Sequence, residues 1–298
     1  MMLTWQHLLT YGLLTFALAV LWLPAKEIKA IPLRLWQLLC LAALACGLLF
    51  GYIQPIGLLP ITVLALSCYC TGFARYPKSV RIIAGTVMLL LSVALSQHLV
   101  PGFANPKIID SMILSKGGSP YSRYLNFDKI LVGLFILGFT FNNLLATPQA
   151  WRLMCKRAAP VSAGTIFVLL LLSFALGYVR FDPKYSALIW FWAWTNLFFT
   201  CIAEDAVYRG VVQRYLIAAL PEYRYREAAG LLLAAVLFGL THYPGGAKYI
   251  LLSTAAGLGY GWTYLRTGQI EASILTHFSL NCLHFLLFTY PALASAAA

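Results

Sequence analysis

Long apolar runs, separated by short polar stretches, occupy most of this chain. Ten of them approach or exceed the length of about 17 to 25 residues that crosses a bilayer as a helix. In chain order they cover residues 5–23, 34–54, 56–74, 82–101, 129–147, 161–179, 186–203, 228–242, 248–265 and 270–290. This pattern predicts an all-α fold, a polytopic transmembrane helical bundle of about ten spans.

Composition agrees with a chain whose main solvent is lipid. It is 61% hydrophobic and 10% charged, with a mean hydropathy of +0.80. The net charge of +12 is scattered over the loops instead of being gathered on one face with interleaved aromatics. Nucleic acid is therefore excluded as a partner, and anionic lipid headgroups are expected to bind the basic loops.

The distribution of Lys and Arg predicts the orientation, because short cytoplasmic loops retain positive charge. If the N-terminus lies outside, most of the Lys and Arg residues fall in cytoplasmic loops. Both termini are then outside, Lys129 lies on the outer side, and the segment after residue 203 is cytoplasmic. The short loops favour a bacterial inner membrane, which the chain crosses many times.

Polar residues at membrane depth divide the chain into two parts. An ionisable group at the centre of a span costs roughly 2.5 to 3.5 kcal/mol, so such groups tend to mark a site. They are scarce in residues 1–160 and frequent in residues 161–298. We predict a scaffold of transmembrane helices in the first part, with a long exposed, extramembrane loop at 101–129, and a catalytic domain in the second.

The first candidate group is the stretch "EDAVYR" at residues 204–209. On a helix, Arg209 projects about 40° from Asp205 but about 140° from Glu204. Asp205 and Arg209 therefore form the favourable acid-before-base pair at i, i+4. This spacing predicts that Glu204 points elsewhere, into a cavity.

Two later segments supply histidines. Phe238 and His242 are spaced i, i+4 in "FGLTHYPGG", where the glycines allow the chain to turn, and His277 and Asn281 share a face of the last span. Hydrolysis of an amide needs a base to activate water, donors for the oxyanion and a proton for the leaving nitrogen. Glu204 suits the role of the base.

These three segments resemble the motifs of the CPBP family of intramembrane proteases, which includes type II CAAX prenyl endopeptidases and the Abi-like bacteriocin-immunity homologues. The family motifs are E-E-x-x-x-R, F-x-x-x-H and H-x-x-x-N or D. Here they are Glu204-Asp205-Ala-Val-Tyr-Arg209, Phe238-Gly-Leu-Thr-His242 and His277-Phe-Ser-Leu-Asn281, in the family's order. The resemblance covers about residues 186–288 and does not extend to the first six spans.

The resemblance implies a glutamic-type endopeptidase core in the C-terminal third, with a conical cavity open toward one side of the membrane. Glu204 would activate water with the assistance of His242, while His277 and Asn281 would stabilise the oxyanion. The supporting residues would be Phe238, Asp205 and Arg209, with Asp205 standing where the family usually has a second glutamate. The substrate would be a membrane protein or a lipid-anchored peptide, and no cofactor would be required.

Three alternatives stay open. Glu204, His242 and His277 could bind zinc, because one carboxylate and two imidazoles form a known catalytic ligand set, although no H-E-x-x-H helix is present. The same residues could relay protons in a proton-coupled transporter, but the first six spans lack a matching half. The protein could also be a non-catalytic immunity protein on the same scaffold.

Overall fold

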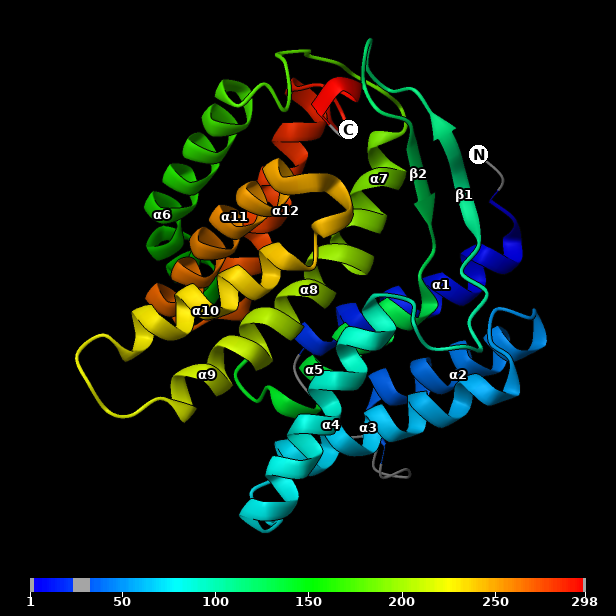
Figure 1. Ribbon diagram of the computed structural model, residues 1–298. Coiled ribbons are helices and arrows are strands. Elements are labelled where there is room, and N and C mark those ends of the chain that lie inside the picture. Colours follow the sequence, from blue (N-terminus) through cyan, green and yellow to red (C-terminus); the bar gives the residue numbers. More distant parts are fainter. Residues whose placement is uncertain (1–2, 24–32, 297–298) are drawn as a thin grey trace. The chain divides into compact units, whose positions relative to one another are not determined.

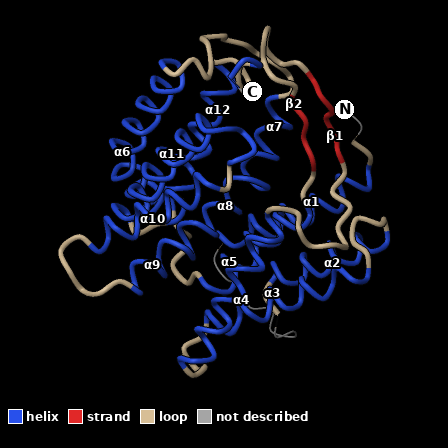
Figure 2. Tube along the Cα trace, in the orientation of Figure 1, coloured by secondary structure: helices blue, strands red, loops and turns tan. Residues whose placement is uncertain are grey.

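The computed structural model describes residues 3–23 and 33–296, which form two compact units. Unit 1 comprises Met1–Ile108, Tyr124–Ala146 and Phe198–Val207, and unit 2 comprises Ile109–Arg123, Thr147–Leu197 and Tyr208–Ala298. Both units are mainly helical, and the two strands form one small sheet (Figure 2). The sequence predicted a scaffold before residue 160 and a catalytic domain after it. That division is defined by function as well as by packing, and it stays a prediction.

Unit 1 is built around a buried helix, α5 (Figure 1). Its elements are α1 (Trp5–Ala19), η1 (Val20–Trp22), α2 (Leu35–Leu49), η2 (Pro55–Gly57), α3 (Leu58–Gly72), α4 (Lys78–Ser96), α5 (Phe127–Thr140) and α8 (Ile202–Val207). Every residue of α5 from Phe127 to Leu137 is buried except the partly exposed Lys129, and the helix packs against α1, α3, α4 and α8. A helix that is apolar all round belongs inside a bundle, and α5 has that position.

Unit 2 is organised around α11. Its elements are α6 (Pro148–Ala175), α7 (Ile189–Asn196), η4 (Tyr208–Gln213), α9 (Arg214–Ala219), α10 (Arg226–Leu240), η5 (Tyr243–Gly245), α11 (Gly246–Thr267), α12 (Ile270–Leu287) and η6 (Ala294–Ala296). Helices α6, α10 and α12 all pack against α11. The candidate residues of α10 and α12 are therefore carried by helices that share one neighbour.

Each of the predicted apolar runs contains a helix, but the number of membrane spans is smaller among the described residues. Five helices are long and apolar enough to cross a bilayer, namely Trp5–Trp22, Pro55–Gly72, Lys78–Ser96, Pro148–Ala175 and Ile270–Leu287. Helix α10 and the segment Tyr243–Thr267 pass only as a pair bent by 62°, which is a broken span or a re-entrant loop and raises the number to six. Ten spans are therefore not confirmed. The shorter helices α2 and α5, at 15 and 14 residues, would extend only about 22 Å, less than the roughly 30 Å hydrocarbon core.

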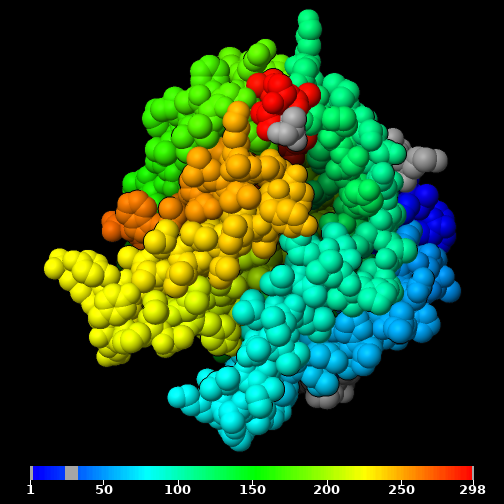
Figure 3. All heavy atoms as spheres, in the orientation of Figure 1, coloured from blue at the N-terminus to red at the C-terminus, as the bar shows by residue number. Residues whose placement is uncertain are grey.

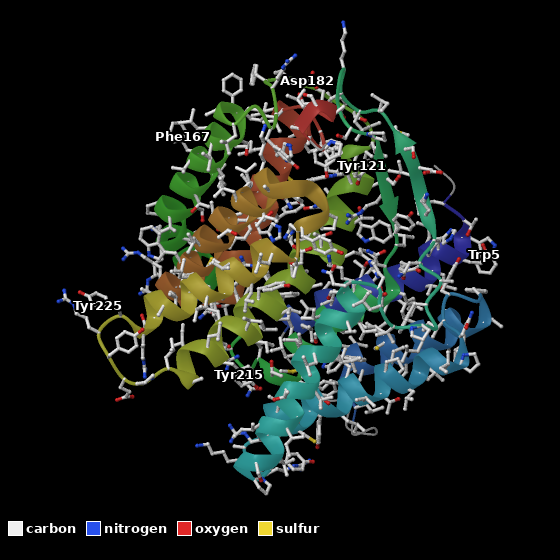
Figure 4. All side chains as sticks on the ribbon, in the orientation of Figure 1. Trp5, Tyr121, Phe167, Asp182, Tyr215 and Tyr225 are labelled. Atoms are coloured by element: carbon white, nitrogen blue, oxygen red, sulfur yellow. The ribbon has the colours of Figure 1, made fainter. Side chains whose placement is uncertain are left out.

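The outer face of α6 is apolar and exposed. Phe167, Leu171 and Phe174 are 68%, 55% and 52% exposed, and Phe167 points away from the protein (Figure 4). Helix α6, in green, forms part of the molecular surface in Figure 3. Exposure of so continuous an apolar helix face to water would be unfavourable, whereas contact with lipid is favourable. The protein is an integral membrane protein.

Helix α6 also begins earlier than the apolar run indicates. It starts at Pro148 and not at residue 161, after Thr147, whose hydroxyl accepts a hydrogen bond from the backbone N–H of Ala150 at 3.3 Å. The basic residues predicted to lie in a loop before it, Arg152, Lys156 and Arg157, are thus helical. Arg and Lys are good helix formers, and their long apolar stems allow the charged ends to reach the membrane surface. Charge alone therefore does not end the helix.

The segment predicted as an exposed loop at 101–129 is folded, and that expectation is wrong. Strands β1 (Lys107–Met112) and β2 (Tyr121–Tyr124) pair within it, and α5 already begins at Phe127. Ile109 and Tyr121, one in each strand, are 2% and 6% exposed, so this segment contributes buried apolar side chains. The location of this segment outside the membrane stays a prediction.

The segment after α6 holds the end of α12, the helix that carries His277 and Asn281. The backbone N–H groups of Asp182 and Lys184 donate to the carbonyls of Leu287 and Leu286, both at 2.8 Å. Outside the helices, the hydroxyl of Ser115 and the ammonium of Lys184 lower the pKa of Asp182. The last turn of α12 is thereby fixed within unit 2.

Close packing of α3 on α5 depends on Gly72. A Cβ added at Gly72 would meet the carbonyl oxygen of Phe139, which is backbone and cannot move aside. We expect Gly72→Ala to lower the free energy of unfolding by about 1 to 3 kcal/mol, seen as a lower Tm in detergent. A Cβ added at Gly12 on α1 would meet no neighbouring atom within 4 Å, so Gly12→Ala is the matched control and should be neutral or stabilising. Equal Tm values for the two variants would contradict this packing.

Candidate active site

Glu204, Asp205 and Arg209 lie inside one uninterrupted helical run from Ile189 to Ala219. The run consists of α7, the π-helical turn η3 (Leu197–Cys201), α8, the π-helical turn η4, and α9. The predicted span ended at residue 203, but the helix continues, because the residues after the charged pair are again helix formers or apolar. Glu204 is therefore a mid-helix residue.

Two π-helical turns flank the charged pair. Turn η3 ends at Cys201, and turn η4 contains Arg209. Each π-helical turn shifts the phase of the residues that follow it, so the spacing of 100° per residue does not extend to Arg209. Asp205 and Arg209 are 0% and 2% exposed, but they belong to units 1 and 2 respectively. Their predicted ion pair stays a prediction.

In unit 1, Glu204 forms an ion pair with Lys129 of α5. The distance from Lys129 Nζ to Glu204 Oε1 is 2.7 Å, and the two side chains are 14% and 13% exposed. An ammonium at this distance stabilises the ionised carboxylate and fixes its orientation. Glu204 is thus held by Lys129, whereas the sequence predicted only that its carboxylate points into a cavity.

This contact also corrects the predicted topology. Lys129 was assigned to the outer side, and the segment after residue 203 to the cytoplasm. Two atoms 2.7 Å apart lie at one depth, whereas the two sides of the hydrocarbon core are about 30 Å apart. The two assignments cannot both hold. The prediction assigned charges loop by loop, but the helical run that carries Glu204 continues to Ala219 with no loop at residue 203.

In unit 2, the guanidinium of Arg209 lies between two aromatic rings. Its Cζ is 4.4 Å from the ring centroid of Phe238 and 5.1 Å from that of Tyr260. Its Nη2 donates a hydrogen bond to the carbonyl of Gly257 at 3.3 Å. A buried cation over two rings gains cation–π stabilisation and fixes the rings in turn. Arg209 therefore supports the residues packed on those rings.

His242 lies at the break between α10 and α11. Its Nδ1 is 2.8 Å from the carbonyl oxygen of Phe238, and its ring is 4.7 Å from the Phe238 ring and 5.1 Å from that of Tyr249. Because a carbonyl only accepts, Nδ1 donates this hydrogen bond, and in the neutral imidazole Nε2 is then the nitrogen with the lone pair. The predicted turn after the histidine is confirmed, with Gly246 at φ +79°, a backbone conformation that favours glycine.

His277 and Asn281 lie one turn apart on α12. The His277 side chain is 5% exposed and stacks on Tyr260, with ring centroids 4.5 Å apart and an interplanar angle of 19°. Its ring centroid is 6.2 Å from that of Phe238. Asn281 Nδ2 donates to Asn196 Oδ1 at 3.2 Å. Both side chains are therefore held in defined orientations.

Phe238 is the centre of the arrangement in unit 2. Its ring contacts Arg209, His242 and His277, so residues of all three sequence motifs meet around one aromatic side chain. Glu204 and Asp205 belong to unit 1. Their position relative to the histidines, and with it the complete set of predicted catalytic residues, stays a prediction.

Two contributing residues were not predicted. Tyr260 lies in the "GLGYG" stretch, and its signal was a single aromatic residue between glycines that let helices approach closely. An added Cβ at Gly257 would lie 3.0 Å from Ala235 Cα, which shows that approach. For Lys129 the indication in the sequence was weaker, because it was only a charged residue at the start of the apolar run 129–147.

The described part of each unit, taken by itself, holds no group of three or more His, Cys, Asp and Glu side chains arranged to bind a metal ion. The zinc set considered from the sequence combines Glu204 of unit 1 with His242 and His277 of unit 2. The arrangement of side chains within either unit therefore does not decide whether these three residues bind zinc.

Comparison with known proteins identifies the segment that carries the motifs. Residues 186–283 match the family described as type II CAAX prenyl endopeptidase Rce1-like. No curated protein and no solved structure matches the chain. The resemblance inferred from the three motifs is confirmed over these residues, which include all seven predicted site residues and exclude α1 to α6.

Proposed function

We propose that this protein is an intramembrane endopeptidase that hydrolyses a peptide bond of a membrane-associated substrate. The observation that carries the proposal is the match of residues 186–283 to a family of proteases, over the segment that contains all three motifs. The buried cluster around Phe238 supports it, because residues from each motif meet there.

In the proposed reaction, the carboxylate of Glu204 accepts a proton from a water molecule, and the water oxygen attacks the carbonyl carbon of the substrate. N–H donors of His277 and Asn281 stabilise the negative charge on the carbonyl oxygen. When the C–N bond breaks, the proton passes from Glu204 to the leaving nitrogen. His242 assists by accepting a hydrogen bond from the water through Nε2.

The surroundings of these side chains favour this division of roles. His242 is oriented by the carbonyl of Phe238, and His277 by the face of Tyr260. Arg209 braces both rings that support the histidines. Such preorganisation lowers the cost of reorienting polar groups as charge develops in the transition state.

We further propose that the protein crosses a bacterial inner membrane several times, and that its substrate is a membrane protein or a lipid-anchored peptide. Apolar helices long enough to span a bilayer support the first statement. The net charge of +12 favours contact with anionic lipids at the cytoplasmic surface.

A comparison of membrane proteomes tests the function directly. Cells carrying the wild-type protein are compared with cells carrying Glu204→Gln, and we expect at least one polypeptide to accumulate uncut in the variant. Identical proteomes would contradict proteolysis and favour an immunity protein. Proton-driven uptake in vesicles without any cleavage would favour a transporter.

The proposed mechanism needs no metal ion, which leads to a separate prediction. Purified protein treated with a chelator is expected to cleave its substrate at an unchanged rate. Elemental analysis of the same sample is the measurement that accompanies the assay. Stoichiometric zinc whose removal abolishes cleavage would contradict the mechanism and identify Glu204, His242 and His277 as ligands.

A further inference from the structure

The ion pair between Lys129 and Glu204 links the candidate base to a helix outside the segment that matches the protease family. Lys129 belongs to α5, and the matching segment begins at residue 186. We propose that Lys129 is a positioning residue that keeps Glu204 ionised and correctly oriented. This inference rests on the proposed function, because it assigns Lys129 a role in activating the base.

The packing of α5 on α8 brings the lysine to the carboxylate. Lys129 and Gly133 are spaced i, i+4 and lie on one face of α5. A Cβ at Gly133 would lie only 3.1 Å from Ala203 Cα, so the two backbones approach closely beside Glu204. The lysine thus reaches the carboxylate from a helix that cannot easily move away.

Side chains from the preceding segment fix the first turn of α5. Asp128 is 1% exposed and accepts hydrogen bonds from Asn105 Nδ2, at 3.2 and 3.1 Å, and from the backbone N–H of Lys129, at 2.8 Å. His98 Nδ1 lies 2.7 Å from the same carboxylate. Asn105 Oδ1 accepts from the backbone N–H of Phe127 at 2.8 Å. These bonds satisfy amides that a helix start leaves unpaired, and they hold the backbone from which Lys129 extends.

Electrostatics explains why the base needs this cation. Glu204 is followed directly by Asp205, so two acidic residues adjoin in the chain. The elements of unit 1 that pack on α8 are α4 and α5. Their charged side chains are Lys78 and Arg81 in the first turn of α4, and Asp128 and Lys129 in the first turn of α5. Lys129 is in direct contact with Glu204 and offsets its negative charge.

A purely structural ion pair would behave differently from a positioning residue. Loss of a structural pair lowers stability but leaves the pH dependence of the reaction unchanged. Loss of a positioning cation removes the charge that stabilises the ionised carboxylate, so we expect kcat to fall and to recover as the pH rises. The pH profile of cleavage therefore separates the two roles.

The test uses full-length protein in vesicles of phosphatidylethanolamine and phosphatidylglycerol, with the polypeptide that accumulates in Glu204→Gln membranes as substrate. For Lys129→Met we expect kcat at pH 7 to fall by about tenfold or more, with the acidic limb of the pH profile moved to higher pH and KM little changed. Lys129→Arg should restore the rate and the profile. Lys116→Met, which removes an exposed lysine of the hairpin, is the matched control and should behave as wild type.

The outcomes distinguish this inference from the proposed function. If Glu204→Gln is inactive while Lys129→Met keeps the wild-type kcat and pH profile, the role of Lys129 is refuted and the protease assignment stands. If Glu204→Gln cleaves at the wild-type rate, the proposed function itself fails. Should Lys129→Met not fold, Lys129→Gln is measured in its place, because it retains a hydrogen-bond donor without the charge.

Discussion

Glu204→Gln is expected to lower the rate of peptide-bond hydrolysis by about 10²- to 10⁴-fold, the range that a positioned general base contributes. The amide has nearly the same shape as the carboxylate but cannot accept the proton of water. Its carbonyl oxygen can still accept a hydrogen bond from Lys129 Nζ, so the contact seen at 2.7 Å can persist in the variant. The measurement is kcat for the purified, reconstituted variant, with Tm as a check of folding.

Glu222→Gln provides the matched control for this substitution. The Glu222 side chain is 91% exposed and pairs with Arg226 at i, i+4, so its loss removes an equal charge at a solvated position. Such a surface pair contributes little, and we expect neither kcat nor Tm to change appreciably. A folded Glu204→Gln protein with the wild-type rate would remove Glu204 from the mechanism.

Apolar periodicity predicted most of the helices but not their extents. The ends of α6 and of the run that contains Glu204 were misplaced, because both helices continue through charged residues. The π-helical turns η3 and η4 have no recognisable pattern in the sequence, since they arise from packing around them and not from local propensity. The hairpin formed by β1 and β2 was missed because two strands of 6 and 4 residues carry too short an alternation to outweigh a polar loop.

The site was predictable where its geometry is local. Phe238 and His242 were identified from the sequence as an i, i+4 pair, and their two rings are in contact. The contact between Lys129 and Glu204 joins residues 75 positions apart, and no periodicity encodes such a separation. The same holds for the stacking of Tyr260 on His277, which depends on how α11 and α12 pack.

His277→Ala is expected to lower kcat by about 10²- to 10³-fold, because it removes a donor to the oxyanion. The imidazole is 5% exposed and stacks on Tyr260, so the substitution also leaves that ring without its neighbour. Two further variants separate the contribution of the donor from that of the stack. Tyr260→Phe keeps the aromatic face and should retain most activity, whereas Tyr260→Leu should lose part of it by releasing the imidazole.

His7→Ala is the matched control, because His7 also stacks on a tyrosine. Its ring lies 5.2 Å from that of Tyr52 at an interplanar angle of 26°, in α1 and outside the three motifs. Loss of this stack should leave kcat unchanged, with at most a small fall in Tm from the lost cap of α1. If His7→Ala and His277→Ala reduced cleavage equally, the loss would come from the lost histidine–tyrosine stack and its effect on folding, and His277 would have no separate role as a donor to the oxyanion. Loss confined to His277 instead means that its imidazole contributes to the transition state.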